Sequence, residues 1–288
     1  MEPLFSAVIC GCNAVLFREA LHKVYNPRIQ RGDTCFAANV LGATGPLLSA
    51  LVHFFEDGRW GSLAVTAIEG QSLTAEDQLF ILMQAGLYLT ATRGLGAPEA
   101  RICYERAEPL CHSLGRPLLL CVALTGQWRY TLMTDKMSAA MPIANRLYSL
   151  AQEQDDPTLM LGAYRALAAT FYRLGDFESA LQYAMRGVQL WRSGRVQSHA
   201  EEYYTPVVGC LCYEALSEWH LGDIASWQAT IGEAISLAKE LNDLNALALA
   251  LHVAAFLAHY EVILLKWNAW HRNCLSYQLL TIFCIGQL

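Results

Sequence analysis

The sequence predicts an all-α protein arranged as a right-handed solenoid of helical hairpins. Three observations lead to this fold class. A turn signature recurs along the chain, apolar residues between its copies repeat at the spacing of one helical face, and no alternating run rich in Val, Ile and Thr indicates a strand. A hairpin with a single apolar face cannot bury that face alone, so neighbouring hairpins are expected to stack.

The turn signature is clearest at residues 174–180, which read LGDFESA. Copies stand at 221–226 (LGDIAS) and 133–139 (MTDKMSA), with a looser one at 95–100 (LGAPEA). Their anchor positions 96, 135, 176 and 223 are spaced by 39, 41 and 47 residues. Glycine ends a helix because it tolerates the left-handed conformation, and Asp then caps the next helix by accepting a backbone N–H. Each copy therefore predicts a turn between two antiparallel helices.

Helix starts follow from capping chemistry. Thr74 and Asp77 form a capping-box pattern with Asp in place of Glu, Asp156-Pro157 places proline in the first turn, and Asp243 precedes a run rich in Ala and Leu. With the turn signatures, these signals predict eleven helices. They are expected near 13–25, 46–56, 74–93, 98–114, 117–133, 136–153, 157–174, 177–192, 205–221, 224–241 and 244–260.

The pattern divides the chain into a poorly defined N-terminal segment at 1–45, a solenoid at 46–260 and an atypical tail at 261–288. The stretch 26–45 is polar and rich in turn residues, which indicates a loop entering the solenoid. Residues 262–288 contain no Asp or Glu and no Gly-Asp turn. Two interpretations of this tail stay open: an unusual terminal cap, or a stretch in which the native reading frame was lost. The second is favoured, because a cap should present a polar outer face.

Composition narrows the functional classes. Apolar residues make up 54% of the chain and charged residues 16%, so many faces need burial and little charge covers them. The formal net charge is −6 and no basic stripe is present, which argues against nucleic acid. The ten cysteines form no disulfide framework of the secreted type, so we expect a cytoplasmic protein. Residues 244–260 approach the length of a membrane span, but a buried solenoid helix is the favoured interpretation and no membrane partner is expected.

No pattern of catalytic residues stands out. Residues 42–49 superficially resemble a phosphate-binding loop, but they lack its lysine, and Pro46 removes a donor N–H. Neither a nucleophile elbow nor a Gly-rich dinucleotide turn is present. The acid pairs Asp155/Asp156 and Glu201/Glu202 stand beside turns, where solvation explains them best. We therefore expect a non-enzyme.

Metal and cofactor sites are not expected either. The spacing of Cys10 and Cys12, and of Cys210 and Cys212, is too short for a zinc pair, and residues two apart on a helix point to different sides. Buried packing is the favoured role of these cysteines. His252 and His259 share a helical face without a third ligand. The expected cofactor set is therefore none.

Residues 162–191 resemble the tetratricopeptide consensus. They read GAYRALAATFYRLGDFESALQYAMRGVQLW, with Tyr164, Leu167, Ala168 and Phe171 on one face of the first helix. The other copies depart more: Glu214 stands where the consensus has Leu, and the spacing of 39–47 exceeds the usual 34. The resemblance implies tetratricopeptide-like hairpins with longer helices or linkers.

A wider resemblance covers about residues 70–260. The stretches 118–132, 140–191, 206–222 and 233–243 are similar to the C-terminal helical-repeat region of large bacterial signal-transduction ATPases, many of which also carry an adenylate/guanylate cyclase-type domain. In such proteins the repeats bind a partner or ligand and restrain the ATPase. The ATPase and cyclase motifs are absent here, so the resemblance implies a scaffold or a regulatory fragment without activity of its own.

The same resemblance implies a concave groove lined by the first helix of each hairpin. By the register of residues 162–191, the groove is expected to contain Arg93, Arg165, Tyr172, Arg173, Trp219 and His220. Such a groove would suit an acidic or aromatic peptide, or a protein partner such as an ATPase or cyclase module. Packing of these aromatic residues against the next hairpin is an equally weighted alternative.

Overall fold

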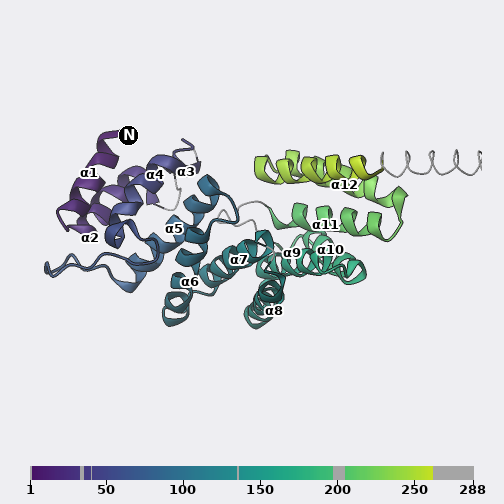
Figure 1. The fold of residues 1–288 in the computed structure, drawn as a ribbon, viewed down its shortest axis with the longest axis horizontal. Coiled ribbons are helices and arrows are strands. Elements are labelled where there is room, and N and C mark those ends of the chain that lie inside the picture. Colours follow the sequence, from purple (N-terminus) through teal and green to yellow (C-terminus); the bar gives the residue numbers. More distant parts are fainter. Residues whose placement is uncertain (1, 33–35, 40, 135, 197–204, 262–288) are drawn as a thin grey trace, which may run out of the picture.

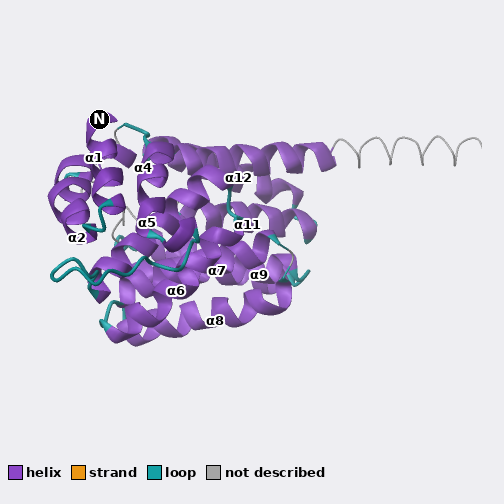
Figure 2. Cartoon of the chain, turned by 60° about the vertical axis from the view of Figure 1, so that its left-hand side comes forward, coloured by secondary structure: helices purple, strands orange, loops and turns teal. Residues whose placement is uncertain are grey.

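The computed structural model describes residues 2–32, 36–39, 41–134, 136–196 and 205–261. Helices fill this part of the chain (Figure 1; Figure 2), and the only extended pairing in it is a single bridge between Phe55 and Leu63. The all-α expectation is therefore confirmed. The tail at 262–288, Asp135 and the Glu201/Glu202 pair lie outside the described residues.

Four hairpins follow one another from α5 to α12, and each helix packs on the next in sequence. Their first helices are α5 Ala75–Arg93, α7 Pro117–Met133, α9 Pro157–Arg173 and α11 Pro206–His220. Their second helices are α6 Pro98–Ser113, α8 Met137–Gln154, α10 Phe177–Arg192 and α12 Ile224–Glu240. A last described helix, Leu244–Glu261, follows α12. The first helices α5, α7, α9 and α11 also contact one another in order, as in a helical repeat array.

The predicted caps form where the sequence places them. Thr74 Oγ1 accepts from the Asp77 N–H at 3.2 Å, and an Asp77 carboxylate oxygen accepts from the Thr74 N–H at 3.0 Å. Asp176 caps α10 by accepting from the Ser179 N–H at 3.0 Å. Gly175 ends the preceding helix at φ 82°. The eight hairpin helices consequently begin and end within one residue of their predicted bounds.

Two copies of the turn signature differ from this pattern. The helix α8 begins after Lys136, which makes no side-chain cap hydrogen bond, and the looser copy before α6 differs as well. The glycine with a positive φ between α5 and α6 is Gly94, at φ 90° and ψ 169°, and not Gly96 as the signature predicts. Ala97 precedes α6 without a capping side chain, and Pro98 opens the helix. The fixed φ of proline suits the first position of a helix, so α6 begins at Pro98 without the Asp of the other copies.

The N-terminal segment contains more helix than predicted. Its elements are α1 Glu2–Asn13, α2 Phe17–Glu19, the π-helix η1 Ala20–Gln30 and α3 Phe36–Asn39. Where a helix was predicted at 46–56, the structure has α4 Thr44–Leu51 and the short 3-10 helices η3 Val52–Phe54 and η4 Glu56–Gly58. The loop expected from residue 26 onward begins later, because η1 runs through Pro27 to Gln30. Val8 and Tyr25 are buried in the same core as the hairpins α5–α9. Asp77 at the start of α5 joins this segment to the hairpins through His22 at 2.8 Å.

Two hydrophobic cores meet at α9. One extends from Val8 to Ala169, and the other joins α9, α11, α12 and the last helix from Leu161 to Leu257. The last helix, expected to be buried, buries only one face. Ala246 and Ala250 are inaccessible, whereas Leu244 is 75% exposed and Leu251 50% exposed. It is also the one helix in the described part that is long and apolar enough to cross a membrane.

Close packing of α5, α6 and α7 depends on two glycines beside Tyr104. A β-carbon at Gly126 of α7 would lie 2.3 Å from the Tyr104 ring, and one at Gly86 of α5 would lie 2.7 Å from it. Tyr104 is 4% exposed and has no free space to move into. The aromatic ring of α6 is therefore held between two helix backbones.

We expect Gly126→Ala to lower the free energy of unfolding by about 1–3 kcal/mol, because the overpacked ring must shift. The effect should appear as a lower urea midpoint measured by circular dichroism. Gly232→Ala in α12 is the matched control: no atom lies within 4 Å of the added carbon, so the helix propensity of alanine should stabilise the protein by up to about 1 kcal/mol. Equal behaviour of the two variants would contradict the packing account.

Candidate interaction surface

Three of the predicted site residues come together at the ends of α9 and α11. The Tyr172 hydroxyl and His220 Nε2 are 3.1 Å apart and share a hydrogen bond, and the two rings stack at 5.4 Å with an interplanar angle of 3°. The Trp219 ring lies 4.8 Å from His220. Tyr172 and His220 therefore contact each other between neighbouring hairpins, as the packing alternative predicts, and His220 stays exposed. A partner-binding groove at this place stays a prediction.

The ring contacts continue in both directions. Phe177, the first residue of α10, lies 4.2 Å from His220, and Tyr260 of the last helix lies 5.4 Å from Trp219. Phe256 lies 4.6 Å from Tyr260. We call this set the aromatic row: Phe177, Tyr172, His220, Trp219, Tyr260 and Phe256. It crosses the last two hairpins and the last described helix, and Phe256 and Tyr260 are 39% and 38% exposed.

The row forms because the first helices of the hairpins stack in register. Asp156 caps α9, accepting from the Thr158 N–H at 2.7 Å. Asp243 caps the last helix and also accepts from the backbone N–H and the hydroxyl of Thr205, the residue before α11, each at 2.7 Å. Helices that begin together and have similar lengths also end together. Their last turns therefore present Tyr172, Trp219 and Tyr260 side by side.

The row is uncharged near neutral pH. Burial lowers the pKa of His220, which keeps the imidazole neutral. Burial also raises the pKa of Tyr172, so its phenol stays protonated. Arg173 is exposed beside the row and is the nearest predicted cation. The resulting surface is a line of neutral rings with a positive charge at one side.

Arg165 does not belong to this surface, which corrects the groove prediction. Its side chain is 0% exposed, and its guanidinium carbon lies 5.1 Å from the ring centre of Trp128. Trp128 is itself 1% exposed and donates from Nε1 to Thr170 Oγ1 at 2.9 Å. The inner face between α7 and α9 is therefore filled by an indole from the preceding hairpin. The repeat register correctly predicted that Arg165 points toward the inner face of the array. It could not predict that the Trp128 side chain fills that face.

Arg93 also lies apart from the row. It is exposed at the end of α5 and forms an ion pair with Glu99 in the first turn of α6. No contact joins it to the aromatic row within the described residues. Its charge is partly neutralised by its own hairpin, so the groove prediction does not extend to α5.

Buried packing is confirmed for Cys12, Cys210 and Cys212, but the prediction is wrong for Cys10. Cys210 and Cys212 are 0% and 1% exposed in α11, and burial raises the pKa of the Cys212 thiol. Cys12 is buried and Cys10 is exposed. Among the described residues, no three His, Cys, Asp or Glu side chains converge as metal ligands.

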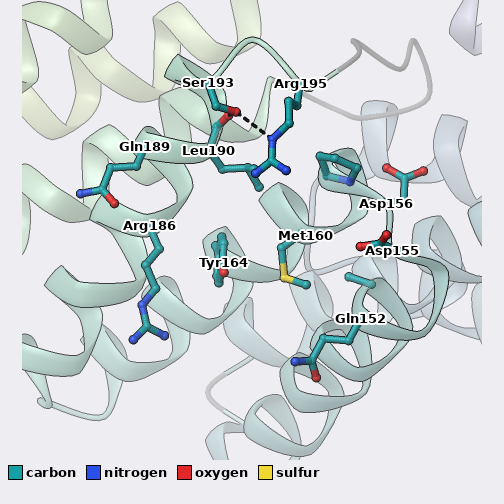
Figure 3. Close-up of a pocket in the computed structure, with 12 residues that line it drawn as sticks. Gln152, Asp155, Asp156, Met160, Tyr164, Arg186, Gln189, Leu190, Ser193 and Arg195 are labelled. Atoms are coloured by element: carbon teal, nitrogen blue, oxygen red, sulfur yellow. Dashed lines mark hydrogen bonds between the residues drawn. The ribbon is translucent and has the colours of Figure 1, made fainter.

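A hollow that the sequence did not predict lies at the N-terminal end of α9, opposite the end that carries the aromatic row. It measures about 600 Å³ and lies between the ends of α8 and α10, with α9 beneath (Figure 3). Asp155 and Asp156, interpreted from sequence as solvated turn acids, line one side, and Arg186 and Arg195 of the α10 end line the other. The only sequence signal for this hollow was a pair of acidic residues followed by arginines 30–40 positions later. The sequence alone does not show that these opposite charges lie close together.

Comparison of the sequence with protein-family models gives no match, and comparison with curated proteins gives no significant relative.

Proposed function

We propose that this chain is a protein–protein interaction scaffold, a right-handed solenoid of tetratricopeptide-like hairpins that holds a peptide or protein partner on its aromatic row. The observation that supports it is the continuity of the row across two hairpins and the last described helix, from Phe177 to Phe256. Exposed aromatic residues are typical anchors of protein interfaces, because they bury a large area at low entropic cost.

The chemistry of the row favours an aromatic or acidic partner segment. Neutral rings at Tyr172 and His220 offer stacking surfaces, and Arg173 offers a fork of donors for a carboxylate. The partner binds along the last turns of the first helices, and not in the interior between α7 and α9, which Trp128 fills. The scaffold is proposed to be cytoplasmic and non-enzymatic, with no cofactor.

The alternative is a regulatory or sensor fragment that acts on a separate signalling ATPase or nucleotide cyclase module. One observation favours it: the last described helix exposes a second apolar face, with Leu244 and Leu251 75% and 50% accessible. Large exposed apolar patches mark interaction sites. The two functions predict the same row but differ in the partner's identity.

The test is partner capture by the full-length chain, with His220→Ala and Tyr260→Ala as the row variants. Truncating an interface anchor costs about 2 kcal/mol, so we expect retention of the specific partner to fall about thirtyfold. Tyr148→Ala is the matched control, because Tyr148 is a half-buried tyrosine on α8, outside the row. Circular dichroism confirms that each variant is folded.

Two outcomes would contradict the proposal: capture unchanged in both row variants, or an equal loss in the Tyr148→Ala control. Capture of an ATPase or cyclase module would select the regulatory alternative. Capture of any other partner through the row would select the general scaffold.

A further inference from the structure

The hollow at the N-terminal end of α9 is separate from the aromatic row. Tyr172 and Pro157 stand at opposite ends of α9, fifteen residues apart, which corresponds to about 22 Å along a helix. The hollow's volume of about 600 Å³ falls within the range of about 300–1,000 Å³ typical of small-ligand sites. A ligand there would not compete with a partner on the row.

One wall of the hollow is positive. Arg186 and Arg195 belong to the C-terminal part of α10 and the turn after it, and both are exposed. Arg195 Nε donates to Ser193 Oγ at 3.4 Å, and the Arg186 guanidinium lies 5.3 Å from the ring centre of Tyr183. Neither arginine forms an ion pair with any described residue. Figure 3 shows the two guanidinium groups apart from each other, so each can pair with an anion separately.

The opposite wall is negative. Asp155 holds a left-handed conformation at φ 47° between α8 and α9, and it forms no ion pair within the described chain. Asp156 uses one carboxylate oxygen, Oδ1, to cap α9. The other oxygen makes no hydrogen bond among the described residues. This wall therefore suits a cation, and Figure 3 shows it facing the arginines across the hollow.

The floor between the two walls is largely apolar and well packed. Met160 and Tyr164 of α9 lie between the charged groups in Figure 3. The Tyr164 ring is held between Tyr148 of α8 and Tyr183 of α10, at 6.1 Å and 6.2 Å. Neighbouring rings on both sides keep the floor in place before a ligand arrives, which lowers the entropic cost of binding.

We propose that this hollow binds a short zwitterionic peptide. Its C-terminal carboxylate pairs with one arginine of the positive wall, Arg186 or Arg195. Its N-terminal ammonium pairs with Asp155 and Asp156, and an apolar side chain between the two termini rests on Met160 and Tyr164. An extended tripeptide, which spans roughly 10 Å, is the shortest probe with an apolar residue between two charged termini. The site recognises both termini, so it selects free short peptides over internal segments of a protein.

The test is calorimetric titration of the full chain with three probes: the tripeptide alanyl-leucyl-alanine, its N-acetylated form and its C-terminal amide. Acetylation removes the cation and amidation removes the anion. Losing one charge-assisted contact costs about 1.5–3 kcal/mol, so each blocked probe should bind at least about tenfold more weakly than the free tripeptide.

Substitutions of the residues that line the hollow test whether the tripeptide binds there. Arg186→Gln with Arg195→Gln should weaken the free tripeptide at least about tenfold, and Asp155→Asn should do the same while keeping a residue that tolerates positive φ. Arg192→Gln is the control, since Arg192 lies on the same helix but pairs with Glu233 of α12 at 2.6 Å. Circular dichroism of each variant checks the fold.

The proposal is overturned if the free tripeptide shows no saturable binding, if the blocked probes bind as tightly, or if Arg192→Gln weakens binding as much as the hollow variants do. The aromatic-row variants His220→Ala and Tyr260→Ala should leave tripeptide binding unchanged. Failure of partner capture and failure of tripeptide binding are thus separate results.

Discussion

Replacing Trp128 by alanine is expected to lower the free energy of unfolding by about 3–5 kcal/mol, the cost of deleting a large buried aromatic side chain. Trp128 is 1% exposed and belongs to the core that extends from the N-terminal helices to α9. Its indole also donates to Thr170 Oγ1 at 2.9 Å, which joins two successive hairpins. In a repeat array much of the stability resides in such interfaces between neighbours.

Two further variants separate packing from hydrogen bonding. Trp128→Phe keeps much of the ring volume but loses the donor, and Thr170→Val leaves the buried indole N–H without its acceptor, at a cost of about 1–3 kcal/mol. Urea unfolding followed by circular dichroism measures all three. Leu174→Ala serves as the surface control, because Leu174 is 51% exposed. If Trp128→Ala lowers the free energy of unfolding by less than about 1 kcal/mol, the Trp128 ring does not stabilise the packing between α7 and α9.

The second large effect is a pH dependence of stability centred on Glu214 of α11. Burial is the main cause that raises the pKa of Glu214 to about 7, and the charge of Glu218 one turn later adds to it. Arg192 of α10 opposes this shift, and Glu233 of α12 reinforces it. Because Arg192 is already paired with Glu233, its charge only partly offsets the burial.

The sign of the effect follows from linkage. A carboxyl group whose pKa is raised by folding binds its proton more tightly in the folded state, so its contribution is fully present below about pH 4.5 and is lost as the pH rises through about 7. We expect the free energy of unfolding to fall by about 1–2 kcal/mol between pH 5 and pH 8.5, after allowance for solvent screening of this partly exposed group.

Glu214→Gln should remove most of this dependence, since the amide cannot ionise. At pH 8.5 the variant should be more stable than the parent chain, and at pH 5 the two should be similar. Urea midpoints at pH 5, 7 and 8.5 measure the effect, with Glu153→Gln at an exposed site of α8 as the charge control. A slope that is unchanged by Glu214→Gln would place the pH dependence elsewhere.

The hairpin helices were predictable because their limits are set by local chemistry. Caps at Asp156, Asp176 and Asp223 and the left-handed glycines Gly175 and Gly222 act within a few residues of the chain. The N-terminal helices carry fewer such signals. Leu16 before α2 and Glu19 before η1 form no side-chain cap, so packing of these helices against α1 decides where they lie.

The candidate site also contains one part that local sequence patterns predicted and one part that depends on tertiary packing. Tyr172, Trp219 and His220 occupy equivalent last positions of successive first helices, so repeat register alone predicted that they would be neighbours. Arg165 shares that register with Tyr172 and is nevertheless buried, because Trp128 from the preceding hairpin covers it. The hollow depends on contacts between α8, α9 and α10 that no local pattern encodes.

By itself, the sequence determined the helical class, the turns and the alignment of equivalent residues, because capping and helical periodicity are short-range properties of the backbone. Only the tertiary structure decided which aligned side chains are exposed, which are covered and which opposite charges meet across a hollow. Those outcomes depend on the volume and shape of side chains 30–50 residues away, such as Trp128 over Arg165 and Tyr260 beside Trp219.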